Sequence, residues 1–484
     1  MSLKEKTLHG LSWSFIDNFV VKTVTFVVGV VLARLLAPSE FGIIAYTYFF
    51  TAIFSTFVDS GLSGALIRKD NCTSTDCSTV FYFNLAFGIL LYLLLWLLAP
   101  MAESFFEVPG FALILRITGL SLVIGTLGGI QQTLFVKRVD FKTKTKISLC
   151  SVILAGIIAI ILAYKGFGVW SLVWQSLLRQ VFSTALVWFF SNWRPDIVFS
   201  FKSFRELFDF GYKMALSRLL DVVFGSIFTP IIGKNFSPST LGQFERSSQF
   251  TGLFSSTLTK NIQRVTYPVL ATIQNDPDKL KLGYRKMINS TMLITFAGML
   301  GLAAVAKQLV LIFYGEQWLP CVPYMQLICF SSMLYPLHAM NLNIIMVIGR
   351  SDLFLKLEII KKVLTIPLIF IALQFGVIAL LIGDIFFSVI AYLLNSYYSA
   401  DLIRYPTKEQ IKDILPFFMV SICVSALVWC ISFLEWNIFV TAILQIGAGA
   451  LLTIGIYEMI NQSDYRELKQ TGLQFLGKIF RRKI

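Results

Sequence analysis

The chain is a succession of apolar runs, each long enough to cross a lipid bilayer as a helix. Spanning the hydrocarbon layer takes about 20 mainly apolar residues. Charged residues make up only 14% of the 484 residues, whereas a soluble domain carries about 25%. We therefore predict an all-α polytopic membrane protein with about fourteen transmembrane helices. The runs lie near 12–36, 41–64, 79–100, 111–135, 147–164, 167–190, 208–233, 240–264, 287–306, 321–347, 357–374, 376–400, 413–433 and 437–460.

The positive charges indicate how these spans are oriented. The even-numbered connections and the two ends hold most of the 41 Lys and Arg residues, whereas the odd-numbered connections hold only Lys165, Lys234 and Lys307. Cytoplasmic connections of membrane proteins are enriched in Lys and Arg. We expect both termini and every even connection in the cytoplasm, which requires an even number of spans. The net charge of +14 is then explained by the Lys and Arg residues of the cytoplasmic connections. We therefore expect no nucleic-acid partner.

Motifs of catalysis and of metal binding are missing from the sequence. None of the seven cysteines forms a CxxC pair, and there are only two histidines. The nucleotide-binding G-x-x-x-x-G-K-[ST], the metalloprotease HExxH and the hydrolase GxSxG are also missing. We expect a protein that is not an enzyme and that has no bound cofactor or metal.

An internal repeat divides most of the chain into two copies of one unit. The motif Pro38-Ser39-x-x-Gly42 after the first span returns as Pro238-Ser239-x-x-Gly242 after the seventh. Two further pairs follow in the same order, Arg138-x-Asp140 with Arg350-x-Asp352, and Phe167-Gly168-Val169 with Phe375-Gly376-Val377. We predict two parallel six-helix repeats as lobes around a central cavity, a transporter architecture. The expected domains are 1–206, 207–402, and a segment 403–484 with two extra helices and a basic tail.

The repeated motif itself is interpreted as structural. Pro38 and Pro238 are expected to end one helix, and Ser39 and Ser239 to cap the next one. The basic residues before them, Arg34 and Lys234, suit a helix C-terminus.

Charged residues inside the spans are candidates for function, because an ion in the bilayer is costly. Lys22 and Arg218 lie at equal depth in the first helix of each repeat, as a cavity shared by the two lobes requires. A basic cavity suits an anionic cargo such as a pyrophosphate. The predicted cargo-binding residues are Lys22, Arg179, Arg218 and Arg246, and the predicted sites for a coupling cation are Asp17, Asp59, Asp221 and Asp384.

Several of these charges also have a purely structural interpretation. Arg218 and Asp221 are three residues apart on one helix and can neutralise each other. Asp17 and Asp59 lie near the cytoplasmic edge, where a carboxylate can be capped or paired. Two further segments, Ile197–Phe210 and Asp464–Ile484, mix apolar and basic residues and are expected to be interfacial helices on anionic lipid.

Several motifs resemble a known family. They are Gly10-Leu-Ser-Trp13, Val31–Gly42, Asp59–Ile67, Gln132–Lys142 and Ile262–Leu270. Together they resemble the bacterial polysaccharide transport proteins: the Wzx-type lipopolysaccharide or O-antigen flippases and the colanic acid exporter group. The similarity covers about residues 10–400. It places the chain in the multidrug/oligosaccharidyl-lipid/polysaccharide exporter superfamily.

The resemblance implies a function. In that family the cargo is an undecaprenyl-pyrophosphate-linked oligosaccharide, moved from the cytoplasmic to the periplasmic leaflet of the inner membrane by alternating access. A proton or sodium gradient is the implied driving force, membrane lipids surround the protein, and polysaccharide polymerase or export machinery is an implied partner. Many relatives have an acidic residue in the seventh helix, where this chain has Phe228-Thr229-Pro230 with Asp221 earlier.

Two other functions stay open at this point. A small-molecule drug/cation antiporter of the same superfamily would have an acidic cavity, which the basic bias of the intramembrane charges disfavours. A membrane-embedded glycan polymerase or ligase would need a long periplasmic loop, and the longest odd-numbered connection is short.

Overall fold

The computed structural model describes residues 17–59, 61–434, 436–460, 465–466 and 469–470. The described residues form helices and connections without a strand, which confirms the all-α prediction. Packing divides the chain into two compact units, 1–245 and 246–484. The predicted boundaries at 206 and 402 stay a prediction, since they follow the sequence repeat and not the packing.

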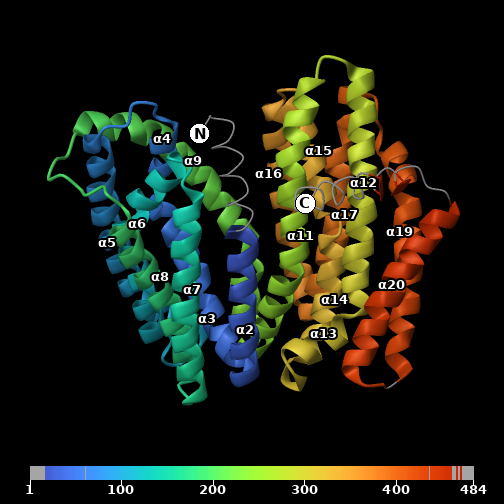
Figure 1. Ribbon diagram of the computed structural model, residues 1–484, viewed down its shortest axis with the longest axis horizontal. Coiled ribbons are helices and arrows are strands. Elements are labelled where there is room, and N and C mark those ends of the chain that lie inside the picture. Colours follow the sequence, from blue (N-terminus) through green and yellow to red (C-terminus); the bar gives the residue numbers. More distant parts are fainter. Residues whose placement is uncertain (1–16, 60, 435, 461–464, 467–468, 471–484) are drawn as a thin grey trace, which may run out of the picture. The chain divides into compact units, whose positions relative to one another are not determined.

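The first unit contains a bundle of long helices (Figure 1). Its elements are η1 (Asp17–Val21), α2 (Lys22–Leu35), α3 (Pro38–Asp59), α4 (Leu62–Arg68), α5 (Ser74–Phe106), α6 (Phe111–Lys137), α7 (Phe141–Tyr164), α8 (Val169–Phe190), α9 (Phe201–Gly225) and α10 (Phe228–Asn235). Helix α6 packs against α3, α5 and α8. It thereby places its polar residues at the middle of the unit.

The second unit is built in the same way. Its elements are α11 (Pro238–Thr272), which begins in the first unit, α12 (Pro277–Ala304), α13 (Ala306–Phe313), η2 (Glu316–Trp318), α14 (Cys321–Ser332), α15 (Tyr335–Val347), α16 (Ser351–Leu373), α17 (Val377–Tyr397), α18 (Ser399–Ile403), α19 (Thr407–Cys430), η3 (Ile431–Leu434) and α20 (Ile438–Ile460). The appended α19 packs along α12 and α20 along α19. Arg285 on α12 donates to Asp413 on α19 over 2.6 Å.

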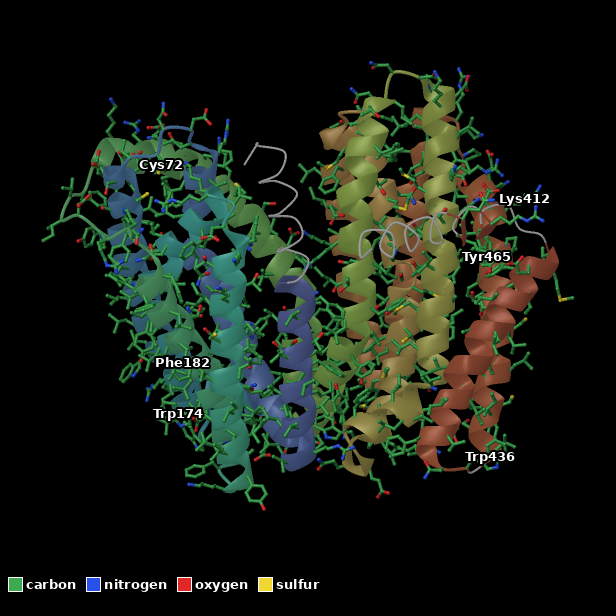
Figure 2. The ribbon with its side chains drawn as sticks, viewed as in Figure 1. Cys72, Trp174, Phe182, Lys412, Trp436 and Tyr465 are labelled. Carbon is green, nitrogen blue, oxygen red and sulfur yellow. The ribbon has the colours of Figure 1, made fainter. Side chains whose placement is uncertain are left out.

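Each predicted span coincides with a helix or with two helices separated by a short break. Nine helical segments among the described residues are long and apolar enough to cross a membrane. The count of fourteen stays a prediction. Lys412 belongs to an even-numbered connection and Trp436 to an odd-numbered one. They lie toward opposite ends of the second unit (Figure 2). Helices that cross a bilayer in alternate directions produce this arrangement.

The segment around the seventh span differs from expectation. An interfacial helix over 197–210 and a separate span over 208–233 were expected, but α9 runs without interruption from Phe201 to Gly225. The break comes later, at 226–227, before α10. The apolar and basic residues at the start of α9 therefore belong to the same continuous helix as the start of the seventh span, and they do not form a separate interfacial helix. The predicted terminal helix and the N-terminal residues before 17 lie almost wholly outside the described residues.

The predicted serine caps are wrong. Pro38 and Pro238 are the first residues of α3 and α11, the helical position at which a missing N–H costs nothing. Ser39 and Ser239 are therefore already inside their helices. Ser237 is the capping residue of α11, since its Oγ accepts from the Thr240 amide at 3.2 Å.

Candidate functional site

A polar cavity lies among the otherwise apolar helices of the first unit. Its volume is about 460 Å³, within the usual range for small-molecule sites of about 300–1,000 Å³. Helices α3, α4, α5, α6 and α8 line it. The polar side chains include Tyr48, Thr51, Ser55, Asp59, Ser63, Asn84, Ser121, Thr126 and Gln180.

Three hydroxyls of this cavity have already used their protons. Thr51, Ser55 and Thr126 each donate their proton to a carbonyl of their own helix, at 2.8, 2.9 and 2.7 Å. A hydroxyl whose proton is used in this way can only accept further hydrogen bonds. Asn84 is 6% exposed, and its Oδ1 has no hydrogen-bond partner among the described residues. The cavity is therefore rich in acceptors.

Asp59 is the carboxylate of the cavity, and it is already engaged. Its Oδ1 accepts from Ser63 at 2.6 Å, and its Oδ2 is 3.3 Å from Nη1 of Arg218 on α9. The sequence left a local pair of Arg218 with Asp221 open. The structure instead pairs Arg218 with a residue 159 positions away. The exposed Asp221 forms no ion pair in the described part of the chain.

The other predicted site residues lie elsewhere. Lys22 is half-buried at the start of α2, and the exposed Arg179 on α8 directly precedes Gln180, which lines the cavity. Asp17 begins η1. Arg246 belongs to the second unit, where it donates to Gln249 at 2.7 Å. Of the eight predicted residues, the structure brings Asp59 and Arg218 together.

Asp384, on α17, lies in a polar group of the second unit. Asp384 lies near Ser331, whose hydroxyl donates to the Ile328 carbonyl at 3.2 Å and whose carbonyl accepts from Ser388 at 2.9 Å. Ser388 in turn is 3.1 Å from Nε2 of His338. In the described part of the chain no three His, Cys, Asp or Glu residues are grouped as metal ligands.

Sequence reasoning missed the uncharged residues of the cavity. Asn84 and Gln180 were overlooked because only ionisable residues were taken as candidates. A signal was present: Asn84 is the only amide residue in the apolar run 79–100, and polar side chains in such runs usually face other helices.

The two copies of the repeated Pro-Ser-x-x-Gly motif touch each other within the first unit. A Cβ placed on Gly42 would be 1.8 Å from the Pro238 carbonyl oxygen, and one on Gly242 would be 1.9 Å from that of Pro38. Only glycine permits so close an approach of two backbones. The contact is reciprocal, since each proline carbonyl lies against the glycine of the other motif.

Further contacts surround this junction. The Tyr46 hydroxyl donates to the Gly233 carbonyl at 2.9 Å. Lys234 Nζ is 2.7 Å from Glu107 Oε1, and the hydrogen bond from Lys234 lowers the pKa of that carboxyl. Arg34 and Lys234 lie in the last turns of α2 and α10, as predicted.

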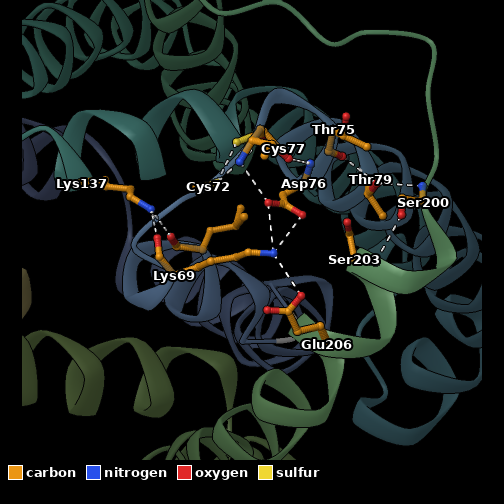
Figure 3. Close-up of polar contacts among 12 residues, drawn as sticks. Lys69, Cys72, Thr75, Asp76, Cys77, Thr79, Lys137, Ser200, Ser203 and Glu206 are labelled. Carbon is orange, nitrogen blue, oxygen red and sulfur yellow. Dashed lines mark hydrogen bonds and ion pairs between the residues drawn. The ribbon is translucent and has the colours of Figure 1, made fainter.

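At the other end of the first unit, polar contacts fix the connection from α4 to α5 (Figure 3). Lys69 is 3.2 Å from Asp76 and 3.1 Å from Glu206 on α9. The Cys72 and Cys77 sulfurs are 3.4 Å apart. A hydrogen bond from Cys77, helped by the nearby Lys137, lowers the pKa of the Cys72 thiol to about 7.

Comparisons with known proteins agree with this architecture. The chain is 25% identical over 404 residues to the lipopolysaccharide biosynthesis protein WzxC of Escherichia coli K12, covering 82% of this chain and 81% of that protein. It is 23% identical over 435 residues to the teichuronic acid biosynthesis protein TuaB of Bacillus subtilis, covering 89% and 90%.

A solved structure has the same fold. The lipid II flippase MurJ in an inward closed conformation superposes with a TM-score of 0.73 at 16% identity, covering 95% of this chain and 99% of that one. Residues 31–323, more than half of the chain, match the family described as polysaccharide biosynthesis protein. These matches confirm the resemblance found in the motifs, and the chain belongs to the polysaccharide biosynthesis protein family.

Proposed function

We propose that this protein is a flippase that moves a lipid-linked oligosaccharide from the cytoplasmic to the periplasmic leaflet of the bacterial inner membrane. Its cargo is an undecaprenyl-pyrophosphate-linked glycan for a surface polysaccharide. Both termini face the cytoplasm in this proposal. The glycan crosses unchanged, so the protein is a transporter and not an enzyme. The downstream partner is the machinery that polymerises or exports the glycan.

One observation supports this proposal above the others. A chain with the fold of MurJ has an acceptor-rich cavity with a cation, Arg218, at its carboxylate. Glycan recognition requires hydrogen-bonding groups of this kind inside a membrane protein, where polar groups without a partner are costly.

Arg218 is the proposed first contact for the pyrophosphate. Its guanidinium is exposed and has one Asp59 oxygen at 3.3 Å, so its other N–H groups can donate to a phosphate oxygen while Asp59 stays paired. Guanidinium binds phosphate through charge-assisted, often bidentate hydrogen bonds. Lys22, Arg179 and Arg246 are proposed to bind the cargo at later positions along its route.

A proton or sodium gradient is the proposed driving force. Among Asp17, Asp59, Asp221 and Asp384, the last is the proposed coupling residue, because Asp59 is engaged by Arg218 and Ser63. Asp384 lies beside Ser331 in a connected polar group with His338. Chains of Asp, His and hydroxyl groups inside a membrane are typical of ion relays.

Deletion of the gene tests the proposed function. The deletion strain is expected to accumulate lipid-linked repeat units in the inner membrane and to lose the surface polysaccharide, and the wild-type gene is expected to restore it. The Lys22→Ala and Arg218→Ala variants are expected to restore it poorly at normal protein level. Full export by both variants contradicts the assignment of these two cations to cargo binding, and a deletion strain with normal polysaccharide contradicts the function.

A further inference from the structure

We propose that the polar cavity of the first unit is a glycan subsite that takes a neutral, hydroxyl-bearing sugar ring of the cargo. The inference rests on the proposed function and adds to it a place where the sugar is recognised. The subsite is separate from the cations proposed for the pyrophosphate. It lies among α3, α5, α6 and α8.

The charge of the cavity favours a neutral ligand. Asp59 is the acidic residue of its lining, and Arg218 neutralises that carboxylate from 3.3 Å. No Lys, Arg or His is among the lining residues, so a phosphate would lose its hydration without gaining a cation. A free cation would have to compete with Arg218 for the carboxylate.

The hydrogen-bonding pattern favours a ligand with several donors. The Thr51, Ser55 and Thr126 hydroxyls have used their protons inside their own helices. The buried Asn84 Oδ1 has no partner among the described residues. Each sugar hydroxyl supplies a donor, so a sugar ring satisfies these acceptors.

The size of the cavity agrees with a ring and not with a single ion. Its volume of about 460 Å³ is that of a small-molecule site. A hard cation such as Ca²⁺ is held by oxygen atoms at about 2.3–2.6 Å, which requires a much smaller space than this cavity. Tyr48, half exposed in the lining, adds an aromatic face.

The position suits loading from the cytoplasmic leaflet. Asp59 is the last residue of α3, the end that the charge distribution predicts to be cytoplasmic. A sugar attached to a pyrophosphate at Arg218 therefore lies next to the cavity. Its hydroxyls reach the acceptors while the pyrophosphate stays on the guanidinium.

Filling the cavity tests the inference. A Cβ on Gly129, in the lining of the cavity, meets no atom within 4 Å, so Gly129→Val adds its side chain to the empty space. Gly455→Val on α20 is the matched control, because its Cβ also meets nothing within 4 Å. The full-length purified proteins are titrated with two probes: the lipid-linked repeat unit isolated from the deletion strain, and undecaprenyl pyrophosphate without sugar.

The wild type and Gly455→Val are expected to bind the sugar-bearing lipid about tenfold more tightly than the sugar-free one, and Gly129→Val is expected to lose that difference. Affinity for the sugar-free lipid is expected to stay unchanged in all three. Equal affinities in the wild type, or a preference that survives in Gly129→Val, overturns the subsite. A Gly129→Val protein that keeps the preference but loses sodium or proton dependence also overturns it, in favour of a cation site.

A second variant protects the test from a folding failure. Asn84→Leu keeps a similar volume and removes the unpartnered acceptor, and it is expected to reduce the sugar preference without changing affinity for undecaprenyl pyrophosphate. An unchanged preference in Asn84→Leu contradicts the inference as well. The failure of the proposed function is distinguishable, because the deletion strain would then accumulate no lipid-linked repeat unit.

Discussion

At the scale of single residues, the pair Asp59–Arg218 positions the guanidinium and adds little to stability. Both side chains are at least partly exposed, and their separation is 3.3 Å. Exposed ion pairs contribute only about 0.2–1 kcal/mol. The pair therefore holds Arg218 next to the cavity, where the free N–H groups of its guanidinium can bind an anion.

Replacing Arg218 tests this role. Arg218→Gln is expected to leave the midpoint of thermal unfolding unchanged and to weaken cargo binding by about tenfold to a hundredfold, the value of a charge-assisted hydrogen bond. Lys213→Gln, an exposed cation on the same helix, is the control and is expected to bind normally. Equal affinity in Arg218→Gln and Lys213→Gln contradicts the role.

Cys72 offers a second residue-scale prediction, on pH and on orientation. Because the hydrogen bond from Cys77 lowers the pKa of Cys72 to about 7, its thiolate is present above that pH and is lost as the pH falls through it. The rate of alkylation at Cys72 is expected to rise to half its maximum near pH 7. A midpoint near the ordinary thiol value of about 8.5 contradicts the assignment.

Two controls belong to this measurement. Cys77→Ala removes the thiol donor that lies 3.4 Å from Cys72, and it is expected to move the midpoint upward. A membrane-impermeant maleimide is expected to label Cys72 in inverted vesicles but not in intact cells, because the charge distribution predicts this connection in the cytoplasm. Labelling in intact cells reverses the predicted orientation.

At the scale of elements, the starts of α3 and α11 form a junction that depends on two glycines. The carbonyl of each proline occupies the space next to the glycine of the other motif. Sequence analysis found the repeat but interpreted its motif only as a helix stop and cap. The interpretation missed the contact because it joins residues 200 positions apart, and local sequence preferences carry no information about such pairs.

Adding one methyl group at this junction is expected to disrupt it. Gly42→Ala and Gly242→Ala are each expected to lower stability by about 1–3 kcal/mol, the usual cost of overpacking, and to reduce export. The losses of stability should be less than additive in the double variant, because both substitutions disrupt the same contact. Calorimetry of the purified proteins measures this.

Gly252→Ala is the matched control on α11, where an added Cβ meets nothing within 4 Å. It is expected to be neutral or slightly stabilising, since alanine is the better helix former. Equal stability in Gly42→Ala, Gly242→Ala and Gly252→Ala would show that the junction tolerates a side chain.

At the scale of the whole molecule, the helical class and the family followed from the sequence because both depend on local patterns. Apolar runs of membrane-spanning length predicted the helices, and short motifs carried the resemblance. The continuous α9 was not predicted, since an amphipathic start and an apolar continuation do not by themselves mark a break. The Asp59–Arg218 pair and the cavity around Asn84 were not predicted either, because each depends on packing between distant segments.

We expect this chain to transfer a lipid-linked glycan between leaflets. The direct measurement reconstitutes the purified protein into liposomes that contain the lipid-linked repeat unit and follows the glycan exposed on each leaflet with an impermeant glycan-modifying reagent. We predict saturable transfer from one leaflet to the other that Lys22→Ala combined with Arg218→Ala abolishes. A leaflet distribution that stays the same as in protein-free liposomes, under both proton and sodium gradients, contradicts the account.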